Sequence, residues 1–142
     1  MTKRLIVILS VGIAFILFFS VSGISGPLPK AVSNNPEAQK LIDQAWELEK
    51  TDSNAEIYKQ CISLLEQAIK LDPNNHMILT DLSRYYWNYG DNLPKETKEQ
   101  QNKLVEIYKT GLSYAEKSLA IKETAAGHYW YAVNKAASHE FS

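Results

Sequence analysis

The sequence predicts an all-α domain of about five helices that follows an N-terminal export segment. Between residues 36 and 138, apolar residues recur at steps of three and four, which is the spacing of one helical face. No window shows the alternation of a β-strand or the turn chemistry of a β-hairpin. Short polar stretches rich in Asn, Asp, Gly and Pro divide the periodic region into segments of helical length.

Residues 1–26 have the pattern of a signal peptide or an N-terminal membrane anchor. Lys3 and Arg4 precede the unbroken apolar run Leu5–Val21, and the small residues that follow fit cleavage after Gly23. The run has 17 residues, the short edge of what spans a bilayer core of about 30 Å, so an uncleaved anchor is the alternative. In both cases we expect export to the periplasm or outer side of the cytoplasmic membrane.

Residues 27–35 are predicted to form a linker, because three prolines fall in or just after them and few apolar positions are periodic. Asn35 is then a suitable N-cap, with Pro36 at the first helical position. The first helix is expected over residues 36–50, and the whole helical domain over residues 36–142.

Four more helices are expected along the domain. The second carries an apolar stripe and ends at Asp72–Pro73, because proline cannot continue a helix. The fourth is the longest, and at 1.5 Å per residue it would reach about 40 Å. The predicted spans of the second to fifth helices are Ile57–Leu71, Leu79–Tyr89 with a stop at Gly90, Pro94 to about Lys122, and Thr124–Ser138.

Composition and motifs argue against several classes of function. The chain has 15 basic and 16 acidic residues; without Lys3 and Arg4 the balance is 13 to 16, a net charge near −3, which disfavours a nucleic-acid partner. Cys61 is the only cysteine and lies on an apolar stripe, so we expect a buried small residue rather than a reactive thiol. Because catalytic and phosphate-binding motifs and metal-ligand spacing are lacking, we expect no enzyme activity, cofactor or metal.

An internal repeat brings two of the expected helices into register. At an offset of 50 residues, Ile57–Ser63 aligns with Ile107–Ser113, and Glu66 aligns with Glu116. Self-similarity at a fixed spacing is typical of arrays built from one repeated supersecondary unit. We therefore expect a helix-turn-helix unit that occurs more than once.

The segments LLEQAIKLDPNN (64–75) and LSRYYWNYG (82–90) resemble the tetratricopeptide-repeat (TPR) family, whose units are helix pairs of about 34 residues. In this pattern Cys61 and Ala68 take the small positions of a second helix, and Pro73 is the closing proline. The spacing of 50 implies 16 inserted residues, mostly residues 91–102. Glu123 stands where the second closing proline would be.

The fourth helix and the segment HYWYAVNKA (128–136) resemble one branch of this family, the TatT-like component associated with TRAP transporters. This resemblance implies an exported protein that pairs with a periplasmic solute-binding protein. The chain departs from the branch because it has no cysteine for lipidation and ends at Ser142, where relatives continue. We therefore expect either a truncated chain or a last helix that packs on another subunit or partner.

In TPR units the first helix of each pair lines the concave surface. This implies groove candidates at Arg84, Trp87, Asn88, Tyr129 and Trp130. The alternative is that the aromatic rings only pack between helices, which we expect for Tyr86 and Tyr131. The resulting hypothesis is a protein-binding scaffold that assists a TRAP-type uptake system, with homo-oligomerisation left open; alternatives are a general adaptor in envelope assembly and a small-molecule carrier with an aromatic-lined groove.

Overall fold

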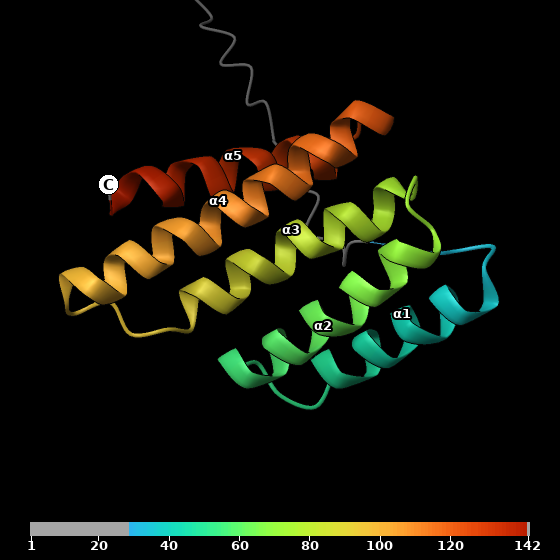
Figure 1. Cartoon of the computed structure of the whole chain (residues 1–142), viewed down its shortest axis with the longest axis horizontal. Coiled ribbons are helices and arrows are strands. Elements are labelled where there is room, and N and C mark those ends of the chain that lie inside the picture. The colour runs from blue at the N-terminus through green and yellow to red at the C-terminus, as the bar shows by residue number, and fades with distance from the viewer. Residues whose placement is uncertain (1–28, 142) are drawn as a thin grey trace, which may run out of the picture.

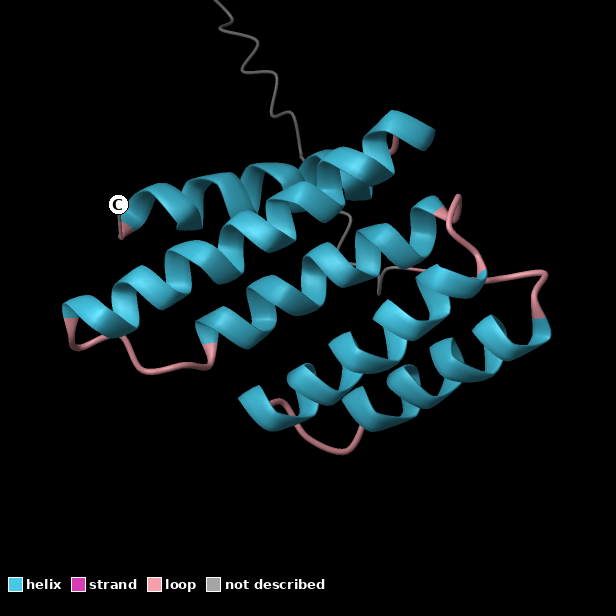
Figure 2. Ribbon diagram, in the orientation of Figure 1, coloured by secondary structure: helices cyan, strands magenta, loops and turns pink. Residues whose placement is uncertain are grey.

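The computed structural model describes residues 29–141, so the predicted signal or anchor segment lies outside the described residues. The expected all-α class is confirmed for this part, which contains helices and loops without strands (Figures 1 and 2). None of its helices is long and apolar enough to cross a membrane. The helices are α1 (Pro36–Glu49), α2 (Ala55–Leu71), α3 (His76–Asp91), α4 (Lys98–Ile121) and α5 (Ala125–Glu140).

Consecutive helices run in opposite directions and pack on one another in chain order (Figure 1). Helix α3 is central, because it contacts α2, α4 and α5. Because α3 also contacts α5, these two helices lie side by side. Residues of α3 and α5 can therefore form one continuous surface.

Several helix boundaries differ from the prediction by a few residues, and two of these differences have a clear structural reason. Helix α4 begins at Lys98 rather than Pro94, because Thr97 and Gln100 form a capping box in which each side chain accepts the other's backbone N–H. Helix α3 continues through Gly90 to Asp91. A Cβ atom at Gly90 would lie 2.6 Å from Cε1 of Tyr108, so this glycine permits close packing instead of ending the helix.

The main apolar core lies between α1, α2 and α3. Cys61 and Ala68 are fully buried, at the positions where small residues were expected, and small side chains let neighbouring helices approach closely. The Cys61 thiol donates a hydrogen bond to the carbonyl oxygen of Ala45 at 3.3 Å. Other buried members of this core are Ala38, Ile42, Leu65, Ile78, Leu82 and Tyr85.

The predicted linker is packed against the helices over its described part. Ala31 is 1% exposed and belongs to the apolar core. Ser33 donates a hydrogen bond to Asp72 at 2.6 Å, and the Asn75 amide donates to the carbonyl oxygen of Val32 at 2.7 Å. The segment is therefore fixed to the turn between α2 and α3.

A buried polar contact joins α3, α4 and α5. The Asn134 side-chain amide nitrogen donates hydrogen bonds to the carbonyl and hydroxyl oxygens of Ser83, at 3.1 and 3.0 Å, and to the carbonyl oxygen of Trp130 at 3.0 Å. Gly111 of α4 faces this amide. A Cβ atom at Gly111 would overlap the Asn134 side chain, with Cγ only 2.8 Å away.

We expect Gly111→Ala to lower the free energy of unfolding by about 1–3 kcal/mol through overpacking. At an exposed helical site the same change would raise it by about 1 kcal/mol, so the sign of the effect reports the clash. Urea unfolding followed by circular dichroism measures it. The double variant Gly111→Ala, Asn134→Ala is the control, because it removes the overlapping amide and should lose less stability than the two single variants together.

Candidate binding site

The candidate site is built from the adjacent helices α3 and α5. Arg84, Trp87 and Asn88 lie on α3, and Tyr129 and Trp130 lie on α5. The ring centroids of Trp87 and Trp130 are 6.0 Å apart, and those of Tyr129 and Trp130 are 4.9 Å apart with the rings nearly perpendicular. The structure therefore brings three of the five candidates into one aromatic group, which we call the aromatic cluster.

The three rings of this cluster differ in exposure. Trp130 is 8% exposed, and its indole N–H is buried without a hydrogen-bond partner among the described residues. Trp87 is partly buried and packs against the small core around Leu104. Tyr129 is 59% exposed. Trp130 thus supports the surface from below, while Tyr129 and part of Trp87 remain accessible.

Arg84 is held by the fold instead of facing open solvent. Its two terminal nitrogens donate to the two carboxylate oxygens of Glu49 at the end of α1, the longer bond being 2.9 Å. Its guanidinium also lies over the ring of Tyr85, whose hydroxyl donates to Glu49 at 2.7 Å. Asn88 is partly buried at the next turn of α3. Recruiting Arg84 to a partner would require breaking this arrangement.

Asp81 was not singled out by the sequence pattern. Its carboxylate lies 3.5 Å from Nε of Arg84 and accepts the backbone N–H of Ala31. Burial raises the pKa of Asp81 to about 6 and the nearby Glu49 adds to this, while Arg84 opposes it. For Glu49 burial also acts to raise the pKa, but Arg84 and Tyr85 outweigh it and hold the pKa below its usual value. The feature that could have identified Asp81 is that it is an acidic residue between buried neighbours, three positions before an arginine.

The other tyrosines discussed from the sequence make contacts outside the aromatic cluster. Tyr86 is partly buried and stacks on Tyr114, with ring centroids 5.6 Å apart. Both hydroxyls donate to Glu66 of α2, at 2.7 and 3.3 Å. Tyr131 is partly buried on α5 and lies below the ammonium group of Lys135. Tyr86 and Tyr114 thus connect α2, α3 and α4.

The chain has no significant match among protein-family models, curated proteins or solved structures. The geometry of these residues is therefore the structural basis for a functional proposal. That geometry offers an accessible aromatic surface on α3 and α5 and, next to it, a buried group of one arginine and two carboxylates.

Asp81 should make stability depend on pH. Its folded-state pKa of about 6 lies above the unfolded value of 3.8, so the native state binds this proton more tightly and stability rises as pH falls. We expect the protein to gain about 1 kcal/mol from this group between about pH 7 and pH 5. The pKa of His76 is lowered by burial and by Lys122, which has the opposite effect. The measurement is therefore the difference in the free energy of unfolding by urea between the parent and Asp81→Asn, taken at several pH values. A difference that does not change with pH would contradict the prediction.

Cys61 should be unreactive in the folded protein. It is fully buried, and burial raises the pKa of its thiol to about 11, with Glu49 adding to the effect. Because the thiolate is the reactive form, Ellman's reagent should label Cys61 only in denaturant. Labelling of the native protein at the rate of a free thiol would show that the α1–α2 contact opens readily.

Proposed function

We propose that the chain is an exported TPR scaffold that binds another protein through α3 and α5, and that the partner is the extracytoplasmic solute-binding protein of a TRAP-type uptake system. Export follows from the predicted signal segment, and the partner follows from the sequence resemblance. The surface follows from the position of the aromatic cluster.

The helix arrangement supports the repeat interpretation. The residues that match at an offset of 50 lie in α2 and α4, which take equivalent places as the second helices of successive antiparallel pairs. Helix α4 has 24 residues against 17 in α2, and the extra residues lie at its N-terminal end. The inserted residues 91–102 thus supply the α3–α4 loop and the first turn of α4.

The observation that carries the proposed surface is the exposure of Tyr129 beside Trp87 and Trp130. Tyrosine and tryptophan are favoured at protein interfaces, because they bury a large area and lose few rotamers. Trp130 already fixes the ring of Tyr129 by edge contact. A partner would therefore meet a surface that is largely ordered before binding.

We expect Tyr129→Ala and Trp87→Ala each to weaken binding of the purified solute-binding protein by about tenfold or more, the range of a residue at the centre of an interface. Isothermal titration calorimetry measures the dissociation constant. Ile121→Ala is the matched control, because it removes an exposed apolar side chain, 43% exposed, at the end of α4.

Circular dichroism of each variant excludes unfolding as the cause. Equal affinity of the parent, Tyr129→Ala and Trp87→Ala would count against the α3–α5 surface. Absence of binding to any TRAP-type solute-binding protein of the same organism would overturn the partner.

A further inference from the structure

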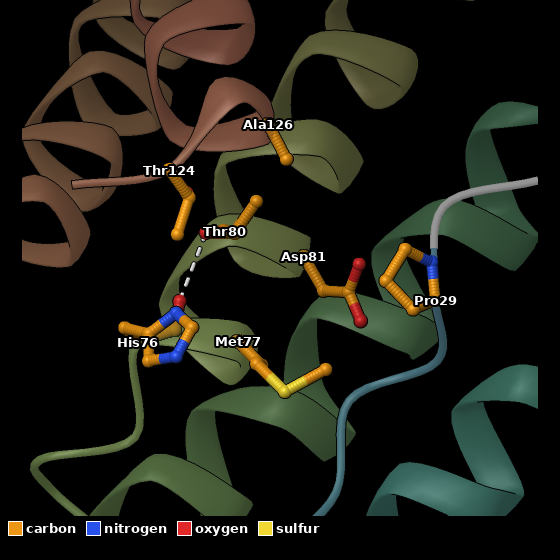
Figure 3. Close-up of a pocket in the computed structure, with 7 residues that line it drawn as sticks. All are labelled: Pro29, His76, Met77, Thr80, Asp81, Thr124 and Ala126. Atoms are coloured by element: carbon orange, nitrogen blue, oxygen red, sulfur yellow. Dashed lines mark hydrogen bonds between the residues drawn. The ribbon is translucent and has the colours of Figure 1, made fainter. Parts of the chain in front are cut away.

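A small cavity lies at the N-terminal part of α3. Its walls come from the first turns of α3, the start of α5 and the segment at Pro29 (Figure 3). Its volume is about 120 Å³. At about 30 Å³ per water molecule, this is room for about four waters, or for a short alkyl chain, whose bonded atoms lie closer together than separate waters do.

The cavity is apolar apart from one carboxylate and one imidazole. Pro29, Met77 and Ala126 contribute apolar surface. The hydroxyl groups of its two threonines are already bonded, since Thr80 pairs with the carbonyl oxygen of His76 and with Ser118, and Thr124 accepts the N–H of Gly127. Figure 3 shows the carboxylate of Asp81 reaching from α3 toward Pro29. Asp81 is thus the charged group that can meet a bound molecule.

Charge around Asp81 is not balanced by the protein. Arg84 is shared between Glu49, which it binds through both terminal nitrogens, and Asp81, which it approaches through Nε. Two carboxylates and one guanidinium leave one negative charge in a buried group. Lys30, next to Pro29 in the chain, is paired with Asp43 at 2.5 Å. An uncompensated buried charge is costly unless a cation or a proton joins it.

We propose that this cavity binds a small primary ammonium ligand, with the ammonium group on Asp81 and a short alkyl chain against Pro29, Met77 and Ala126. The ammonium supplies the missing positive charge and donates hydrogen bonds to the carboxylate. The alkyl chain replaces water on the apolar wall. A carboxylic acid would meet the like charge of Asp81, and a metal ion would find only one carboxylate and one imidazole, with both threonine oxygens engaged. The site is independent of the proposed protein-binding surface.

The test uses n-butylammonium as the probe and n-butanol as its uncharged counterpart, titrated into the purified protein by calorimetry at about pH 7.5. We expect saturable binding of one butylammonium per chain and at least tenfold weaker binding of butanol, because an alkylammonium stays charged at this pH. Asp81→Asn should weaken butylammonium binding at least tenfold.

Asp81→Asn also alters contacts to Arg84 and Ala31, so a second variant keeps the test decisive. Ala126→Leu leaves the carboxylate in place and fills the cavity, and it should abolish binding. Ala132→Leu makes the same change at an exposed site of α5 and should leave binding unchanged. Butylammonium binding that is absent, that butanol equals, or that survives both Asp81→Asn and Ala126→Leu would overturn the proposal.

Binding should also weaken as the pH falls. Asp81 takes up a proton with a pKa of about 6, which competes with the ammonium. The charged groups that face it are Arg84 and His76 of α3 and Glu49 of α1, while α5 contributes uncharged Thr124 and Ala126. Burial and the nearby Lys122 of α4's C-cap lower the pKa of His76, and the protonated imidazole would add repulsion. We expect several-fold weaker binding near pH 5 than near pH 7.5; equal affinity at both would contradict the role of Asp81.

Discussion

The position of α1 relative to α3 depends on the ion pair between Glu49 and Arg84. Both helices pack on α2, and this pair is a direct bridge between them. The Arg84 side chain is 12% exposed, so loss of Glu49 would break both of their hydrogen bonds in a poorly solvated place and leave Asp81, near Nε, as the remaining carboxylate partner. The same guanidinium lies over the ring of Tyr85 and beside Asp81. By binding Glu49 it also positions the carboxylate that accepts the hydrogen bond of the Tyr85 hydroxyl. One side chain therefore sets the geometry of three others.

The second half of the fold is specified by buried polar contacts more than by apolar packing. Asn134 reaches Ser83 across the helix interface, and Gly111 leaves the space that its amide occupies. Thr80 and Ser118 form a similar contact between α3 and α4 at 2.7 Å. Such bonds contribute little net stability, but a helix that slipped by one turn would leave each group buried and unpaired. They therefore select one register for α3, α4 and α5.

The sequence predicted the helices well because apolar periodicity and capping are local signals. It misplaced the start of α4 because Pro94 is as suitable a first residue as the capping box at Thr97, and the choice depends on packing. The sequence predicted that the third helix stops at Gly90, because local signals do not show the close approach of Tyr108, 18 residues further along the chain. The repeat pattern also made Arg84 and Trp87 candidates for one groove, but it could not show that Glu49, from another helix, already binds the guanidinium.

The fold divides the candidate residues into those that are already engaged and those that can still bind. A partner that recruited Arg84 would have to replace the two-point contact with Glu49 and leave Asp81 without its cation. A partner that covered Tyr129 would bury an exposed ring that an adjacent tryptophan already orients. Recruiting Arg84 costs several kcal/mol before any gain, whereas covering Tyr129 gains apolar burial directly. Recognition of a protein by this face is therefore expected through its aromatic end, and the charged end is left for a ligand small enough to reach Asp81.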